Sequence, residues 1–164
     1  MSEAGTTWGQ ARERQISAMR LTCEILGHIL HNVSDDQARA LRDGPDGWSV
    51  IEVLCHLRDF DEIFHRRALM MLEREQPQLP AYDHVAMAVE RAYQRESVAD
   101  AYGALKQSRR LFVQFFEQLT AEQWARGGIH PERGPFSMTD ALMQVGAHDL
   151  DHLEQITRIL RGAD

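Results

Sequence analysis

Residues 47–64 have the sequence GWSVIEVLCHLRDFDEIF, and this stretch decides the fold class. Its apolar side chains recur every three or four residues, as at Val53 and Leu57, which is the spacing of one face of an α-helix. Ser49 and Glu52 form a capping box, in which each side chain accepts a hydrogen bond from the other residue's backbone N–H. The stretch is therefore predicted to begin a long amphipathic helix.

The same apolar spacing recurs along most of the chain. It predicts four long helices, over residues 10–33, 49–74, 97–119 and 137–161. The connection between the second and third helices is long, and a short helix is expected in it over Asp83–Tyr93. A connection of this length can return along the bundle and leave those two helices parallel.

The predicted fold is therefore all-α: a four-helix bundle in up-down-down-up order, with one long crossover. Serine or threonine caps precede several helices, and the cap at Ser137 is paired with Asp140. No run of alternating β-branched residues indicates a strand. With 164 residues and no internal boundary, the chain is predicted to form one domain over residues 1–164.

Composition excludes several classes of function. Eighteen basic against 25 acidic residues leave a net charge of −7, which disfavours a nucleic-acid binder. The isolated basic pairs Arg66-Arg67 and Arg109-Arg110 are interpreted as solvated. No stretch is apolar enough to span a membrane, and the N-terminus lacks the pattern of a signal peptide, so a cytoplasmic protein is expected.

Both cysteines lie in apolar helical patterns. Cys23 and Cys55 are therefore expected to be buried, reduced thiols. A reactive Cys55, activated by the adjacent His56, is disfavoured because neighbouring side chains on a helix point about 100° apart.

Eight histidines are many for this length, and two of them share a helix face. His148 and His152 lie four residues apart and project from the side that carries Val145 and Ile159. Buried imidazoles need polar partners, and one metal ion satisfies both. The pair is therefore a candidate metal site.

His56 lies on the core face of the second predicted helix. It is about 10 Å from the Ser49 cap, and His152 is about 13 Å from the end of its helix at Arg161. If the two helices are antiparallel, the three rings meet at similar heights. Three histidines with open positions are typical of a catalytic or exchangeable metal site. The alternative is three core histidines hydrogen-bonded to carbonyls and carboxylates.

The remaining histidines are expected to lie outside this site. His28 and His31 are placed on a solvated flank, His65 at the surface, and His84 and His130 in connecting segments. His130 is also considered as a residue at a pocket mouth.

Three polar residues are candidates for assisting the triad. Asp59 and Asp149 can orient a ring or take a proton from a bound nucleophile. The alternative for both is an ordinary ion pair with arginine. Gln155 lies on the histidine face and can contact a ligand. Phosphate-binding, dinucleotide-binding and serine-nucleophile motifs are absent, and the paired E-x-x-H motifs of dinuclear bundles are absent too.

Three segments together resemble the DinB-like (DinB/YfiT) superfamily of metal-binding four-helix bundles. They are GWSVIEVLCHLRD at residues 47–59, GPFSMTD at residues 134–140 and HDLDHLEQI at residues 148–156. The order of the helices and the long second connection fit the resemblance across nearly the whole chain.

The resemblance implies a mononuclear zinc or nickel-type site at His56, His148 and His152, and frequent dimerisation. Apolar residues off the main helical stripes, for example Leu69, Met70 and Phe116, are compatible with a homodimer. The alternative is that they pack under the long crossover.

Two functions follow as hypotheses. The superfamily includes S-transferases and isomerases that use low-molecular-weight thiols, so the first is a metal-dependent enzyme, transferase-like or hydrolase-like. Its His₃ site would activate a thiol or a water molecule for reaction with a small-molecule substrate, and Asp59 or Asp149 would assist. The second is a non-catalytic, stress-associated protein that binds a metal or a small molecule.

Overall fold

The computed structural model describes residues 3–162, so both ends of the predicted domain 1–164 lie outside the described residues. Its elements, in chain order, are α1 (Glu3–Leu30), α2 (Asp35–Ala40), α3 (Val50–Glu73), α4 (His84–Glu90), the 3₁₀ helix η1 (Tyr93–Arg95), α5 (Val98–Glu117), α6 (Ala121–Trp124), β1 (Gly127–His130), β2 (Gly134–Ser137) and α7 (Met138–Arg161).

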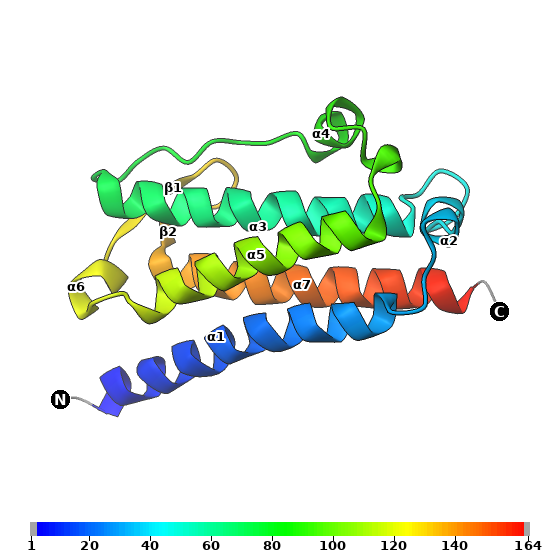
Figure 1. Ribbon diagram of the computed structural model, residues 1–164. Helices are drawn as coiled ribbons and strands as arrows, with labels where there is room; N and C mark the ends of the chain where they lie inside the picture. Colours follow the sequence, from blue (N-terminus) through cyan, green and yellow to red (C-terminus); the bar gives the residue numbers. More distant parts are fainter. Residues whose placement is uncertain (1–2, 163–164) are drawn as a thin grey trace.

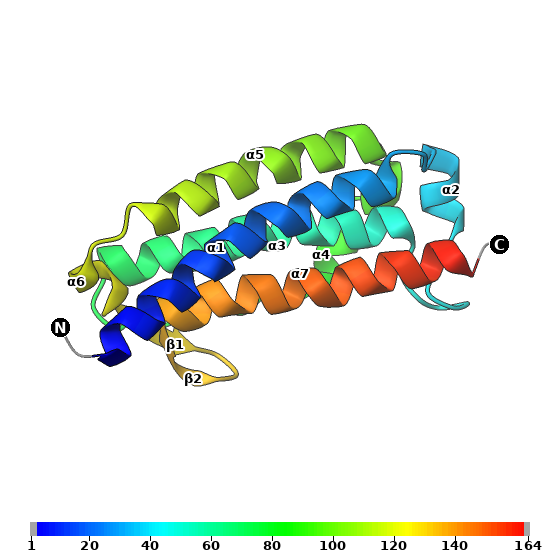
Figure 2. The same cartoon turned by 90° about the horizontal axis from the view of Figure 1, so that it is seen from below.

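The four long helices α1, α3, α5 and α7 form the bundle (Figure 1). Helix α3 packs against α5 and α7, and α1 packs against the same two helices, so α3 and α1 occupy opposite corners. Figures 1 and 2 show α1 and α7 running in one direction and α3 and α5 in the other. The predicted up-down-down-up bundle is confirmed.

Capping residues define where the helices begin, as the sequence predicts. Glu52 Oε2 accepts from the Ser49 N–H at 2.8 Å, and Ser49 Oγ accepts from the Glu52 N–H. Ser137 and Asp140 form the same reciprocal pair at the start of α7. Such a box satisfies two N–H groups that the first helical turn leaves without partners.

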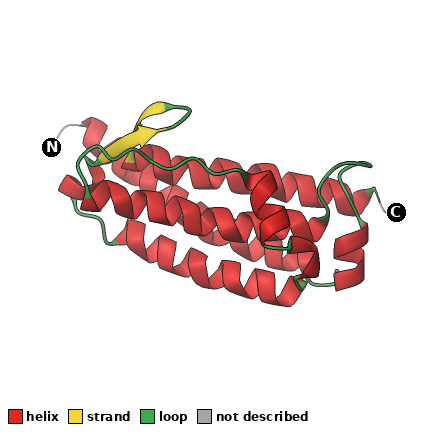
Figure 3. Cartoon of the chain, turned by 90° about the horizontal axis from the view of Figure 1, so that it is seen from above, coloured by secondary structure: helices red, strands yellow, loops and turns green. Residues whose placement is uncertain are grey.

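The crossover between α3 and α5 runs along the outside of the bundle and carries α4 over α3 (Figures 1 and 3). Asp83 caps α4 by accepting from the N–H groups of Val85 and Ala86, both at 3.0 Å. The short helix expected over Asp83–Tyr93 is therefore present, but it ends at Glu90 and is followed by η1.

The expectation that the chain has no strands is wrong. Strands β1 and β2 form an antiparallel hairpin that leads into α7 (Figure 3). Gly134 has φ 71°, a conformation that glycine adopts at low cost. The hairpin also bonds to the crossover, because Ile129 donates its N–H to the Pro77 carbonyl and accepts from the Leu79 N–H, both at 2.8 Å. These distant partners explain why local patterning does not reveal the pair.

Two apolar clusters fill the bundle, one toward the hairpin end and one toward the α2 end. Phe112 and Phe116 belong to the first cluster, and Leu54 and Ile156 to the second. Between them lies a buried polar layer, described below. None of the helices within residues 3–162 combines the length and apolar character needed to cross a membrane.

Candidate metal centre

Three histidines converge where α3 packs against α7. The Nε2 atoms of His56 and His148 are 3.0 Å apart, and the ligand atoms of His56, His148 and His152 all lie within 4.8 Å of one another. The ring centroids are separated by 4.5 to 5.0 Å. The antiparallel packing of α3 and α7 thus brings together the three residues that the sequence selects.

Burial keeps these rings neutral. The pKa of His56 is lowered to about 2, mainly because burial disfavours the charged form and secondarily because His148 and His152 are close. Burial also lowers the pKa of His148 to about 3, and it lowers the pKa of His152. Neutral imidazole is the form that binds a metal, so the cluster is in its ligand state at neutral pH.

The ring of His152 is oriented by a chain of polar contacts. Gln155 Nε2 donates to Asp43 at 3.0 Å, so its Oε1 is the acceptor for His152 Nδ1 at 2.8 Å. Arg158 in turn pairs with Asp43. His152 Nδ1 therefore carries the proton, and Nε2 is left with a free lone pair. A carbonyl acceptor of this kind commonly holds metal-ligating histidines. Gln155 contacts the triad through His152.

The donor set fits a metal ion. Two nitrogens that bind one zinc ion tetrahedrally at about 2.0–2.1 Å lie about 3.3–3.4 Å apart, close to the 3.0 Å between His56 and His148. His56 Nδ1 is buried and has no hydrogen-bond partner among the described residues. Imidazole ligands suit Zn, Ni, Cu and Fe, so the residues alone do not select one metal.

Aromatic side chains surround the triad. Measured between ring centroids, Trp48 lies 4.9 Å from His56 and Phe60 lies 4.3 Å from His56. The ring centroids of Phe64 and His148 are 5.2 Å apart. These rings give the triad a partly apolar surrounding. Electrostatic interactions in an apolar surrounding are stronger than in water.

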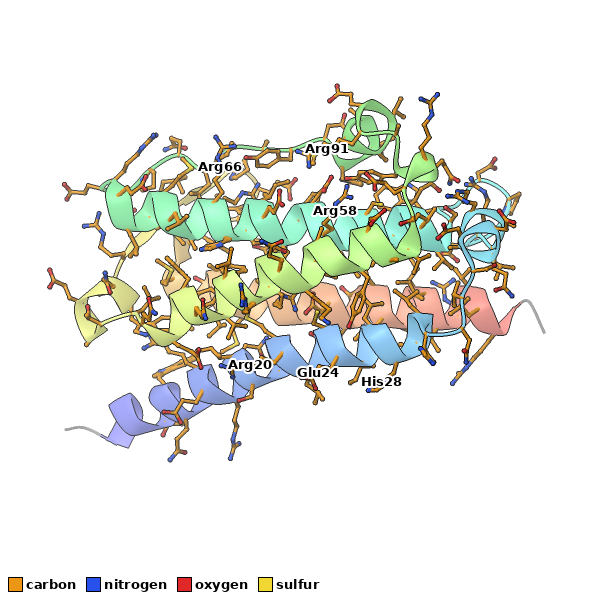
Figure 4. All side chains as sticks on the ribbon, viewed as in Figure 1. Arg20, Glu24, His28, Arg58, Arg66 and Arg91 are labelled. Carbon is orange, nitrogen blue, oxygen red and sulfur yellow. The ribbon has the colours of Figure 1, made fainter. Side chains whose placement is uncertain are left out.

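Asp59, one turn beyond His56, is held by groups outside the triad. Its carboxylate accepts from Arg58 Nε at 2.8 Å and from the Tyr93 hydroxyl at 2.5 Å, and it pairs with Arg91 at 2.9 Å. Figure 4 shows Arg58 and Arg91 on the side of the bundle that faces the crossover. These contacts are those of the ion-pair alternative, and they tie the crossover to α3.

Asp149 also binds an arginine. Its two oxygens accept from Arg109 at 2.6 and 2.9 Å, and Asp149 Oδ2 accepts from the Thr22 hydroxyl at 2.5 Å. Arg109 further donates to Asp61 at 2.7 Å and to the Met19 carbonyl at 2.8 Å. This buried layer joins all four long helices directly beside His148.

Charge balance in this layer depends on Arg109. Burial alone lowers the pKa of Arg109, but Asp61 and Asp149 outweigh it and raise that pKa above its ordinary value. Burial raises the pKa of Asp61 although Arg109 acts in the opposite direction. The interpretation of Arg109 as solvated is wrong, because its guanidinium group is needed to neutralise buried carboxylates. Arg67 is buried too, and Arg66 is exposed as predicted.

The other histidines lie in different environments. His28 and His31 are exposed, as predicted. His65 is half-buried and stacks on Phe112 at 4.8 Å, so the prediction of a surface position is wrong. His130 is buried in β1 and bonds to Arg67 at 3.1 Å, so it does not lie in a connection.

His84 is the residue near the triad that the sequence does not identify. Its ring, at the start of α4, lies 5.8 Å from that of His56 and 5.7 Å from that of Trp48. His84 is 28 residues from His56 in the sequence and belongs to a different helix, so helix periodicity does not relate the two residues. Their proximity depends on the path of the crossover. The one local feature that could have drawn attention to His84 is its position directly after the capping residue Asp83.

Both cysteines are buried and reduced, as predicted. Burial raises the pKa of Cys23 to about 11 and that of Cys55 to about 12, so both remain thiols at neutral pH.

Comparison with known proteins decides the family. Residues 18–156 match the sequence model of the DinB superfamily, which covers most of the chain. The chain belongs to the DinB superfamily. Two relatives of the chain are called "Putative metal-dependent hydrolase". The one from Oceanobacillus iheyensis is 23% identical over 80% of this chain and 75% of its own length. The second, YfiT from Bacillus subtilis, is 26% identical over 73% of this chain and 67% of its own.

Two solved structures show the same fold. The chain superposes on Bacillus subtilis YfiT, described as a probable metal-dependent hydrolase with an unusual four-helix bundle topology. The TM-score is 0.86 at 22% identity, over 99% of this chain and 90% of YfiT. A mycothiol-dependent maleylpyruvate isomerase matches with a TM-score of 0.73 at 10% identity, over 88% of this chain and 60% of the isomerase.

Proposed function

We propose that this DinB protein is a metal-dependent enzyme that acts on a small molecule at a site formed by His56, His148 and His152. One observation carries the proposal: three neutral imidazoles from two helices, one of them buried and two half-buried, have their ligand atoms within 4.8 Å of one another. Such a set supplies three ligands and leaves positions for water or substrate, which distinguishes it from a closed structural site. The hydrolase names of two relatives agree with it.

A divalent ion in this site, with zinc or nickel proposed, would lower the pKa of a bound water or thiol and supply a nucleophile at neutral pH. The residues of the chain would hold and orient it. His152 is fixed by Gln155, and the aromatic rings of Trp48 and Phe60 pack against His56.

Asp59 and Asp149 enter the proposal as positioning residues. Each carboxylate is already bound by an arginine, so its oxygens are engaged outside the triad. Asp59 holds the crossover near His56, and Asp149 links α7 to α5 beside His148.

A thiol-dependent transferase reaction is the second candidate. The fold match to a mycothiol-dependent isomerase favours it, since that protein places thiol chemistry on the same kind of bundle. A cytoplasmic location, which the sequence predicts, would supply the reduced thiol.

Metal analysis and activity measurements test these functions together. We expect about one equivalent of divalent metal in the wild type and its loss in His148→Ala, with exposed His31→Ala as the matched control. Turnover is then sought in a panel of esters and amides and in conjugation reactions with low-molecular-weight thiols, before and after chelation. Metal binding without turnover indicates the non-catalytic alternative, and activity that survives complete metal removal contradicts the mechanism.

A homodimer is part of the proposal. Phe116 is only 1% exposed and packs in the core, so it is not available for an interface. Leu69 and Leu111 are exposed, at 38% and 47%, and line one groove between α3 and α5. Light scattering of the wild type and of Leu111→Glu tests the dimer.

A further inference from the structure

His84 has an unexplained position beside the triad. It is exposed, yet its ring lies 5.8 Å from that of His56, 5.7 Å from that of Trp48 and 6.4 Å from that of Phe60. It is the first residue of α4, in the crossover that covers this side of α3. A polar side chain is therefore held at the rim of an otherwise aromatic wall.

His84 is not a member of the ligand set. Within residues 3–162, the one group of three or more potential ligands that share a 4.8 Å neighbourhood is His56, His148 and His152. His84 therefore lies beside the three candidate ligands without belonging to them.

The path of the crossover fixes His84 from both flanks. Before α4, the Pro80 carbonyl accepts from Arg67 Nη2 at 2.6 Å. After α4, Arg91 and Tyr93 bind the buried carboxylate of Asp59. These anchors bring His84 to α3 at the level of His56, so its position follows from contacts on either side of it.

We propose that His84 binds the substrate: its imidazole N–H donates a hydrogen bond to an anionic group that occupies the side of the triad facing the crossover. An imidazole carries at least one N–H in either protonation state, so the contact does not depend on its titration. The ligand class is a small anion, such as a carboxylate or a thiolate. This inference rests on the proposed metal site and names the kind of ligand it takes.

Anion binding to the cobalt-substituted protein tests the role of His84 without any assay of activity. Azide is titrated while the visible absorption of Co²⁺ is followed. In His84→Ala we expect azide to bind about tenfold more weakly, as loss of a hydrogen bond to a charged group implies. His84→Gln, which keeps an N–H donor, should recover part of the affinity. His28→Ala is the matched control, because His28 projects from α1 on the side away from the crossover (Figure 4).

The outcomes separate this inference from the proposed function. Unchanged azide affinity in His84→Ala, in protein that binds cobalt normally, overturns the role of His84 alone. A changed cobalt spectrum in azide-free His84→Ala overturns it as well, since His84 would then be a ligand. Failure of the wild type to bind cobalt overturns the proposed function and this inference with it. Parallel titrations with acetate and 2-mercaptoethanol distinguish a carboxylate from a thiolate, and a loss with either supports the proposal.

Discussion

Arg109 of α5 and Asp149 of α7 form a two-pronged ion pair in the middle of the bundle, with N–O distances of 2.6 and 2.9 Å. Asp149 directly follows His148, so the pair connects the buried polar layer to the candidate metal centre. Asp61 shares the same guanidinium group at 2.7 Å. One cation thus serves two buried carboxylates on two other helices.

Replacing Arg109 should therefore be strongly destabilising. Arg109→Met leaves Asp61 and Asp149 buried without their cation, and we expect a loss of about 3–5 kcal/mol in the free energy of unfolding. Urea denaturation provides the measurement. Arg110→Met is the matched control, because Arg110 is exposed on the same helix and its replacement should change stability by less than about 0.5 kcal/mol. Equal effects of the two substitutions would contradict the assignment.

Gln155 should matter for metal affinity through His152. Gln155→Ala removes the acceptor that fixes the His152 ring, and we expect metal to bind about 10–100-fold more weakly. Competition with a chromophoric chelator measures the affinity. Leu150→Ala, at a 62% exposed position of α7, should match the wild type. A normal affinity in Gln155→Ala would show that the ring needs no such support.

Acid should destabilise the metal-free protein. The pKa values of His56 and His148 are lowered to about 2 and about 3 in the folded state. An unfolded chain, in which histidine has a pKa of about 6.5, takes up protons that the folded chain cannot. Stability should be constant with respect to these groups above about pH 6.5 and should fall as the pH decreases below it, by up to about 1.4 kcal/mol per pH unit for each histidine.

Urea midpoints of chelator-treated protein between about pH 7.5 and 5.5 span the upper part of this window. His148→Asn removes one of the groups and should give a shallower decline than the wild type. Midpoints that stay constant across the range would show that the rings are protonated without cost in the folded state.

Two glycine-to-alanine substitutions should have opposite effects. A Cβ at Gly27 would lie 2.1 Å from Tyr102 Oη and 2.6 Å from its Cζ, and this ring is held by a 3.0 Å bond to the Cys23 carbonyl. Gly27→Ala should therefore cost about 1–3 kcal/mol. At Gly103 of α5 a Cβ meets nothing within 4 Å, so Gly103→Ala should stabilise the protein by about 0.5–1 kcal/mol. Thermal unfolding of both variants shows whether the first loses stability and the second gains it.

Neither cysteine should react in the folded protein. Cys23 and Cys55 are buried, with pKa values raised to about 11 and about 12 by that burial. A thiol-specific chromogenic disulfide should find no thiol under native conditions and both under denaturing conditions, since the thiolate is the reactive form. Rapid labelling of the native protein would indicate that the bundle opens locally.

The sequence by itself determines the bundle and selects the three candidate ligand histidines. Helix periodicity and the caps at Ser49 and Ser137 are local properties, so they are visible along the chain. The spacing of His148 and His152 is local as well. Counting residues from the helix ends then places His56 at the same level along the bundle as His152, provided that the two helices are antiparallel.

Tertiary structure alone decides the rest. Arg109 resembles a surface residue in the sequence because its carboxylate partners lie on α3 and α7, 48 and 40 residues away along the chain. The hairpin needs Pro77 and Leu79 of the crossover, and His84 reaches the triad only through the path of that same segment. Buried charges and irregular connections depend on partners distant in sequence, and no periodic pattern records such partners.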